Sequence, residues 1–351
     1  MGLILIRKIL IYIALFSAAG WVGLPLSARA ADSGHSFTLV VTGDMMLGNW
    51  AQGVILQKGM AYPFQAVDSV LRDAEVVFAN LEAPFGEGGA PFEKSFTFRV
   101  NPKLVKVLRH GGINLVSLAN NHMMDYGAEV MEQTRRLLKA EGIWFAGAGL
   151  NQQEAMQPAI FTVNGVKVAF VACSLTFPEE FWASDTSAGT YFPYQEVFYR
   201  QIRQLKQEND LVLVSFHWGE ELRKTPKQYQ RQLAHQTVEA GADLIVGHHP
   251  HIIQGLEVYR GKLIAYSLGN FVFGSYSSRA TRSMMLKLRM GTSGIEWCKI
   301  YPLNVDNREV EFQPKLLQGR EREAFLQELK ELSKELNGEQ DVISSGNLVT
   351  L

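Results

Sequence analysis

Cysteine and net charge are the two things that this chain has little of. Only two of its 351 residues are cysteines, and 34 Lys and Arg residues are balanced by 35 Asp and Glu residues, which leaves a formal charge of −1. Two cysteines exclude a disulfide-stapled miniprotein. The near-neutral charge provides no basic field for nucleic acid, which we therefore exclude as a partner. With 47% hydrophobic residues, the chain has a globular composition.

Acidic residues are absent from the first 30 positions. Arg7 and Lys8 precede sixteen apolar residues from Ile9 to Leu24, and Ala28-Arg29-Ala30 supplies a small-x-small pattern. This arrangement predicts a secretory signal peptide over residues 1–30, cleaved near Ala30. An uncleaved anchor is the alternative, but a membrane-spanning helix needs about 20 apolar residues. We therefore expect the protein in the periplasm or at the cell surface. There Cys173 and Cys298 either pair or remain buried free thiols.

Apolar runs of strand length alternate with helical patterns along most of the chain, which predicts an α/β fold with parallel strands. Runs such as LVLVSF lack polar alternation, as expected for strands that are covered on both faces. Asn164-Gly165 and Arg260-Gly261 predict two hairpins, so antiparallel strands join the parallel ones. The expected parallel strands are 37–42, 75–79, 113–118, 144–146, 211–216 and 243–246.

Helices are expected from Asn101-Pro102 to Gly111, over residues 128–141, and from Thr225-Pro226 to Gly241. From Ser283 onward the chain contains the strand-like pieces MMLKLRM, IEWCKIY and REVEF. A helix follows that has Phe325, Leu329, Leu332 and Leu336 on one face, and we expect a loose tail after Asn337. We expect a catalytic-type domain over residues 31–282 and a C-terminal β extension with an amphipathic helix over 283–351.

Five of the eight histidines lie in three short motifs, and each motif follows a predicted strand. The carboxyl ends of strands in an α/β sheet open onto a common crevice, so these polar groups are expected at one edge. The residues delivered there are Asp44, Glu82, Asn121, His122, His217, His248, His249 and His251. His35, His110 and His235 fall outside this pattern, and we interpret them as surface or packing residues.

This set of oxygen and nitrogen donors suits one or two divalent ions such as Zn, Mn or Fe rather than a thiolate site. Two ions would make a bound water nucleophilic near neutral pH, and His122 would act as a proton donor or contact the transition-state oxyanion. Taken singly, Asp44 suits a turn cap equally well, Glu82 is better explained as a surface acid or a helix-start charge, and His217 is better explained as a core histidine. Three histidines in the four residues 248–251 are seldom structural.

Six ordered motifs resemble those of the CapA family of poly-γ-glutamate and capsule synthesis proteins, a branch of the calcineurin-like metallophosphatase superfamily. They cover about two-thirds of the chain and read GDMMLGN, ANLEAPF, SLANNHMMDYG, SFHWGEE, GHHPH and YSLGNFVF. The resemblance implies two mixed β-sheets packed face to face and flanked by helices, an αββα sandwich, with a dinuclear metal centre. It places the metal on Asp44, Glu82, Asn121, His217, His249 and His251.

Two positions depart from the wider superfamily. Met46 stands where a histidine is usual, and Asn80-x-Glu82 replaces Gly-Asp, which leaves open whether one metal position is weaker or empty. Asp125 either holds His122 by a hydrogen bond or starts a helix at Tyr126. Residues expected at the rim of the site, where packing is the alternative, are His248, Trp218, Glu220, Ser267 and Asn270.

Two functions follow as hypotheses. The first is a metal-dependent hydrolase that cleaves a phosphoester or amide bond in an anionic cell-surface polymer or its precursor. The second, which Met46 favours, is a non-catalytic polymer-binding or assembly factor that works with membrane-bound capsule synthesis machinery.

Mass spectrometry of the exported protein tests the signal peptide. Signal peptidase cuts after a small-x-small pattern, so the mature chain should begin at Ala31. An intact N-terminus at Met1 would contradict the cleavage.

Overall fold

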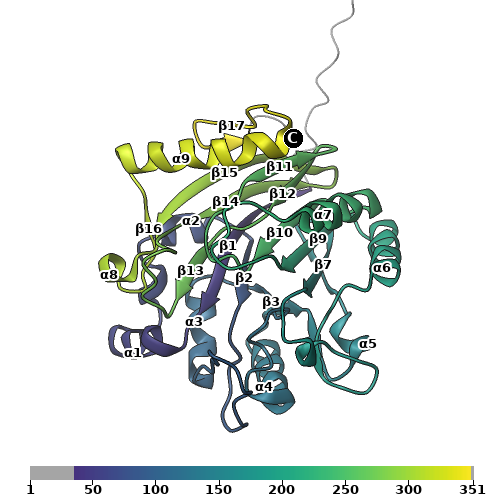
Figure 1. The fold of residues 1–351 in the computed structure, drawn as a ribbon, viewed down its shortest axis with the longest axis vertical. Helices are drawn as coiled ribbons and strands as arrows, with labels where there is room; N and C mark the ends of the chain where they lie inside the picture. Colours follow the sequence, from purple (N-terminus) through teal and green to yellow (C-terminus); the bar gives the residue numbers. More distant parts are fainter. Residues whose placement is uncertain (1–34, 349–351) are drawn as a thin grey trace, which may run out of the picture. The chain divides into compact units, whose positions relative to one another are not determined.

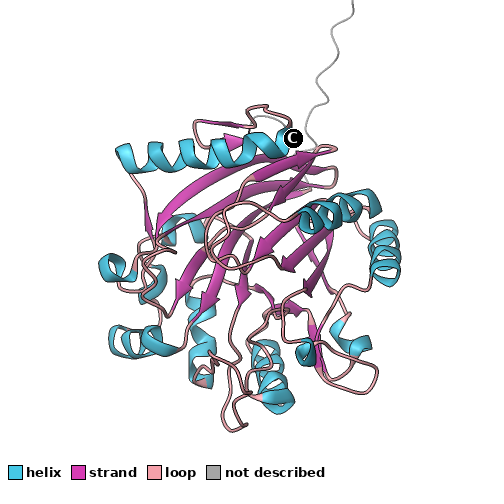
Figure 2. Cartoon of the chain, viewed as in Figure 1, coloured by secondary structure: helices cyan, strands magenta, loops and turns pink. Residues whose placement is uncertain are grey.

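The computed structural model describes residues 35–348, so the predicted signal peptide lies outside the described residues. Within that described part, no helix is both long and apolar enough to cross a membrane. Two mixed β-sheets and the helices around them make up the architecture (Figures 1 and 2).

The larger sheet is built around the first strand. Its order is β17-β18-β15-β14-β1-β2-β3-β4, with β13 also pairing β1 and β16 pairing β15. Strands β2, β3, β4 and β13 run parallel to their neighbours, whereas β14 and β15 are antiparallel. The bounds are β1 (Ser36–Met46), β2 (Val76–Leu81), β3 (Leu115–Ser117), β4 (Trp144–Ala146), β13 (Asn270–Phe273), β14 (Arg282–Gly291), β15 (Gly294–Asn304), β16 (Lys315–Leu316), β17 (Ile343–Ser344) and β18 (Asn347–Leu348).

The smaller sheet contains both predicted hairpins. Its order is β11-β12-β10-β9-β7-β6, and the four strands β7, β9, β10 and β12 are parallel. Both residues of each two-residue turn have positive φ, at Asn164-Gly165 and at Arg260-Gly261, as a type I′ turn requires. The bounds are β6 (Ala159–Val163), β7 (Val166–Ser174), β9 (Leu211–His217), β10 (Leu244–His248), β11 (Leu256–Tyr259) and β12 (Lys262–Ala265), with a separate pair β5 (Ala148–Gly149) and β8 (Gly189–Thr190).

Side-chain alternation along the strands produces three apolar layers. Leu39 and Val41 of β1 pack between the two sheets, where the rings of Phe78 and Phe170 lie 5.1 Å apart, while Val40 faces the opposite way toward helices. This is why the central strands read as continuous apolar runs. The predicted αββα sandwich is confirmed.

Helices cover the outer face of each sheet (Figure 2). The larger sheet is covered by α1 (Asn49–Lys58), α2 (Asp68–Leu71), α3 (Val105–His110) and α4 (Gly127–Ala140). The smaller sheet is covered by α6 (Gln195–Glu208) and α7 (Gln228–Ala240). The remaining helices are α5 (Gln152–Ala155), α8 (Asn307–Val310) and α9 (Gly319–Lys334).

The segment predicted as a C-terminal extension is part of the larger sheet. Strand β14 pairs with β1 from Ser36↔Gly291 to Val41↔Leu286. Helix α9, the long yellow helix in Figure 1, packs Phe325 and Leu329, two residues of its predicted apolar face, into the layer between the sheets.

Two expectations for this segment are wrong. The REVEF piece is the short helix α8, because the Asp306 side chain accepts a hydrogen bond from the Arg308 backbone N–H and caps the helix start. The described part of the tail, up to Leu348, is not loose, since β18 pairs with β15 at Lys299↔Asn347 and buries Leu348.

The cysteines do not pair. Cys173 and Cys298 are buried free thiols in different apolar layers, and burial raises the pKa of both. Protonated, buried thiols are inert packing groups.

Candidate metal centre

Both sheets contribute to one cluster of polar side chains. The larger sheet supplies Asp44 near the end of β1 and Glu82 just after β2, and Asn121-His122 follows β3. The smaller sheet supplies His217 and His248, which end β9 and β10 and are register partners. The cluster therefore forms where the carboxyl ends of strands from two sheets meet, as the motif positions predict.

Two distant motifs position Asp44. The Asp44 N–H donates to the Gly269 carbonyl at 3.0 Å, which joins the GDMMLGN and YSLGNFVF segments. A Cβ atom at Gly43 would lie only 1.8 Å from that same carbonyl oxygen. The glycine before Asp44 is therefore required by close backbone approach.

The Asp44 carboxylate is buried among four partners. Its Oδ1 lies 2.9 Å from Asn80 Nδ2 and 3.2 Å from His248 Nδ1. Its Oδ2 lies 3.1 Å from His251 Nδ1 and accepts from the His249 backbone N–H at 3.2 Å. Burial alone would raise the pKa of Asp44, but its contacts with His248 and His251 outweigh burial and hold the pKa well below its usual range.

Glu82 is fully buried and has an oxygen with no hydrogen-bond partner among the described residues, Oε1. The Nε2 atoms of His217 and His251 each lie 3.7 Å from it. Burial first, and then the charge of Asp44, raise the pKa of Glu82 well above its usual value. A buried carboxylate oxygen of this kind needs a cation or a proton.

Asn80 is a site residue that the motif analysis missed. Its amide nitrogen contacts Asp44 Oδ1, Glu82 Oε2 at 3.3 Å and His217 Nδ1 at 3.2 Å. The available signal was its spacing of two from Glu82, which places both side chains on one face of an extended strand.

Ligand atoms within 4.8 Å of one another form two groups among the described residues. One consists of Asp44, Glu82 and His217, the other of Glu82, His249 and His251, so Glu82 belongs to both. Burial lowers the pKa of His217 and brings that of His249 to about 3, which keeps both imidazoles neutral. Neutral imidazole is the form that binds metal.

His249 and His251 have backbones in the left-handed region, with φ of 96° and 59°. Non-glycine residues seldom adopt this conformation, and such strain concentrates at functional sites. The Nδ1 atom of His249 is buried without a hydrogen-bond partner among the described residues. Burial disfavours the charged form of His251, but Glu82 and Asp44 outweigh it and raise its pKa to about 10. The unpartnered atoms Glu82 Oε1 and His249 Nδ1 fit a divalent metal ion.

Asn121, His122 and Asp125 lie beside these groups. The Asn121 Oδ1 lies 2.8 Å from His217 Nε2. His122 Nδ1 lies 2.8 Å from Asp125 Oδ2, so of the two roles left open for Asp125 the structure has the contact with His122. Lys94 forms an ion pair with Asp125, and no sequence motif indicated it.

The comparisons with known proteins agree with the six motifs. A family model described as "Bacterial capsule synthesis protein PGA_cap" matches residues 38–275. The chain belongs to this family. It is 33% identical over 293 residues to the PGA biosynthesis protein CapA of Bacillus subtilis (strain 168), covering 83% of this chain and 77% of the relative. It is 33% identical over 279 residues to the Capsule biosynthesis protein CapA of Bacillus anthracis, covering 77% and 68%.

Solved structures are more distant from this family member. A 5′-nucleotidase precursor from Thermus thermophilus is 14% identical with a TM-score of 0.48, and the match covers 80% of this chain and 56% of that one. A putative 5′-nucleotidase from Staphylococcus aureus is 13% identical with a TM-score of 0.46, covering 84% and 58%. This chain therefore spans less than two-thirds of either structure.

A cleft of about 630 Å³ opens beside the cluster in this family member. Asn121, His122 and His251 form part of its lining, as does Asn270, whose Oδ1 lies 2.9 Å from His251 Nδ1. Asn270 therefore contributes to the lining of this cleft.

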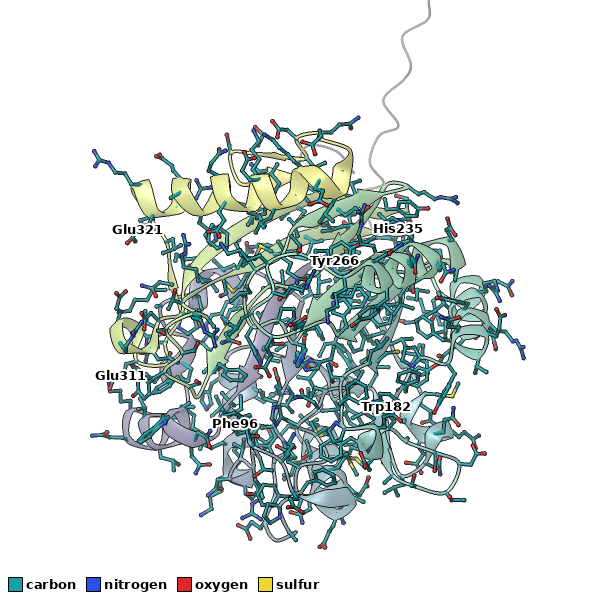
Figure 3. All side chains as sticks on the ribbon, in the orientation of Figure 1. Phe96, Trp182, His235, Tyr266, Glu311 and Glu321 are labelled. Atoms are coloured by element: carbon teal, nitrogen blue, oxygen red, sulfur yellow. The ribbon has the colours of Figure 1, made fainter. Side chains whose placement is uncertain are left out.

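The other four residues expected at the rim have packing or pairing contacts, the alternative left open for them. Trp218 is fully buried and donates to the Tyr266 carbonyl at 3.0 Å, since strand alternation turns it away from the face of His217 (Tyr266 is labelled in Figure 3). Ser267 is buried and donates to Ile252, and His248 is buried against Asp44 and the Phe78 ring. Glu220 pairs with Lys227 at the surface, and its neighbour Glu221 lines the cleft.

The histidines interpreted as packing residues include His235, which stacks on Tyr259 at 3.8 Å between ring centres and lies 2.8 Å from Glu257. It therefore lies outside the cluster.

Gly43→Ala tests the backbone contact that positions Asp44. The added methyl must push Gly269 away, so we expect a loss of about 1–3 kcal/mol in the free energy of unfolding, measured with denaturant. Gly53→Ala is the matched control because nothing lies near its Cβ position in α1, and a helical alanine should stabilise by up to about 1 kcal/mol. Equal stability of the two variants would contradict the role given to Gly43.

Proposed function

We propose that this protein is an exported, metal-dependent hydrolase that acts on an anionic polymer, or its precursor, in capsule or poly-γ-glutamate synthesis. The observation that carries this proposal is the buried cluster of two carboxylates and four imidazoles, with unpartnered donor atoms, beside an open cleft. Membership of the capsule synthesis family supports the polymer as the substrate class.

Asp44, Glu82, His217, His249 and His251 are the residues that would hold metal, and the Asn121 amide oxygen lies next to them. Glu82 belongs to both ligand groups, so it is the residue that two ions would share. When bound, divalent ions supply Lewis-acid polarisation of a phosphoryl or carbonyl oxygen and activate water near neutral pH.

His122 is the side chain placed to exchange a proton with a ligand. It lines the cleft, and its contact with Asp125 occupies Nδ1 and leaves Nε2 as the reactive nitrogen. Asp125 is fixed in turn by the Phe98 backbone N–H at 2.6 Å and by Lys94. Burial lowers the pKa of His122 although Asp125 opposes the shift, so His122 is neutral at pH 7. In this form Nε2 carries a lone pair, so His122 first accepts a proton from a bound ligand and, as imidazolium, returns it to the leaving group.

Met46 favours the second function, a polymer-binding or assembly factor without turnover. It is fully buried in the apolar layer beneath the helices of the larger sheet, so it gives the cluster no ligand. The metal assay and the turnover assay together separate the two functions.

His249→Ala tests the metal centre. Removing an imidazole from one of the two ligand groups should lower bound divalent metal by at least one ion per chain, measured by mass spectrometric metal analysis. His235→Ala, outside the cluster, should keep the wild-type metal content. Absence of stoichiometric metal from the wild-type protein would sink the hydrolase proposal.

His122→Gln tests proton transfer. We expect metal content like that of the wild type and turnover reduced by about 10²–10⁴-fold in a panel of phosphatase, phosphodiesterase and amidase substrates. Wild-type turnover in this variant would remove His122 from the reaction. Background turnover in wild type and variant alike, with metal bound, would favour the assembly factor.

A further inference from the structure

Exposed aromatic side chains gather around the cleft. The three large hydrophobic residues with the greatest exposure in the described chain are Phe96 and Phe177 at 70% and Trp50 at 67%, and all three line it. Tyr276 lines the same cleft, and its ring lies 5.9 Å from that of Trp50. Phe96 is labelled in Figure 3. Apolar surface left open beside a polar cluster is typical of a ligand site.

The cations of the cleft differ in what they contact. Lys94 forms an ion pair with Asp125. Arg279, three residues after Tyr276, is exposed and forms no ion pair with any residue that the structure describes. Glu221 is the acidic residue in the lining. Arg279 is therefore a guanidinium available to a carboxylate or phosphate of a ligand.

Positive charge continues from Arg279 into a second hollow. Arg279 also lines an adjoining hollow of about 120 Å³ together with Lys224 and Arg282. These two cations share a single carboxylate, Glu328, at 3.1 and 2.8 Å. The hollow thus keeps an excess of positive charge.

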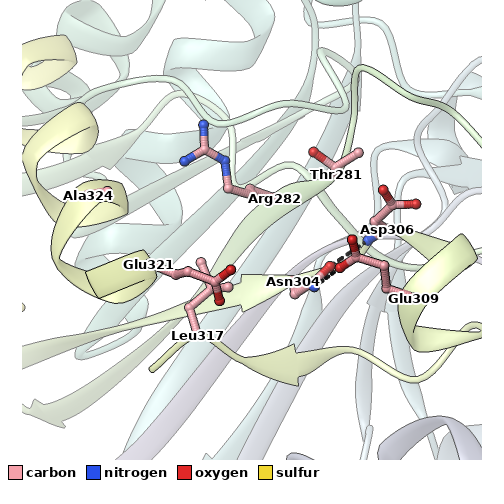
Figure 4. Close-up of a pocket in the computed structure, with 8 residues that line it drawn as sticks. All are labelled: Thr281, Arg282, Asn304, Asp306, Glu309, Leu317, Glu321 and Ala324. Atoms are coloured by element: carbon pink, nitrogen blue, oxygen red, sulfur yellow. Dashed lines mark hydrogen bonds between the residues drawn. The ribbon is translucent and has the colours of Figure 1, made fainter. Parts of the chain in front are cut away.

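The excess of positive charge does not extend beyond Arg282. This residue borders a further pocket of about 260 Å³, shown in Figure 4, where Asp306, Glu309 and Glu321 make the lining acidic. The excess of basic residues is therefore confined to the hollow lined by Arg279, Lys224 and Arg282 and does not extend into the neighbouring pocket.

We propose that Trp50, Tyr276 and Arg279 form a subsite for a second anionic unit of the polymer, outside the metal centre, so that the protein prefers a chain to a monomer. The inference rests on the proposed substrate class. The aromatic rings cover the methylene groups of the chain, Arg279 pairs with its carboxylate, and Lys224 and Arg282 attract the units that follow.

Length-dependent binding tests the subsite. The full metal-loaded protein is titrated calorimetrically with glutamate, a short γ-linked glutamate oligomer and a long one. The wild type should bind the long oligomer more tightly than the short one, and Arg279→Gln should lower the long-to-short affinity ratio by about tenfold. Arg279→Lys should restore part of it because the charge remains, and Trp50→Ala should also lower it.

Arg203→Ala is the matched control, because Arg203 is an exposed arginine on α6 on the outer face of the other sheet. It should keep the wild-type ratio. Equal ratios in Arg279→Gln and Arg203→Ala, or equal binding of a neutral glutamine oligomer, would overturn the subsite. Absence of turnover with the length preference intact would overturn only the hydrolase proposal, whereas turnover without an effect of Arg279 would overturn only the subsite.

Discussion

Two carboxylates buried close together are the constraint on which the rest of the site depends. Asp44 and Glu82 are both withdrawn from water, and each disfavours the charge of the other. Such a pair is stable only when positive charge or protons compensate it. The surrounding imidazoles, the amide of Asn80 and the strained backbone at His249 and His251 are all arrangements that bring compensating groups to these oxygens.

The two sheets contribute different kinds of side chain to the site, as that constraint requires. The larger sheet provides the carboxylates and amides, and the smaller one provides His217, His248, His249 and His251. Packing of Phe78 on Phe170 and of their neighbours between the sheets therefore also sets the distance between anionic and imidazole groups. Core packing and site geometry depend on each other in this fold, because a shift of either sheet would separate the imidazole nitrogens from the carboxylates.

The sequence predicted those parts of the fold and site that depend on local pattern. The ends of the strands that precede Asp, Glu and His, and the two hairpins, could be predicted because hydrophobic periodicity and turn residues act over only a few positions. Trp218 was expected at the rim because it follows the site residue His217. Side-chain alternation instead turns it to the opposite face. The role of Lys94 could not be predicted, because it lies in a loop without a periodic pattern and contacts Asp125, which is distant in the sequence. The ordered tail depends on pairing with β15, a long-range contact that no local pattern encodes.

The pairing of the first described strand with β14 sets the order in which this molecule can be completed. Ser36 and Gly291 are register partners, so the strand that carries Asp44 can pair early with β2 but gains β14 on its other side only after roughly 250 further residues have been made. Closing so large a loop costs entropy that local contacts cannot offset early in folding. The complete sheet around Asp44 is consequently a late product of folding, and a chain that lacks β14 does not hold Asp44 between both of its neighbours.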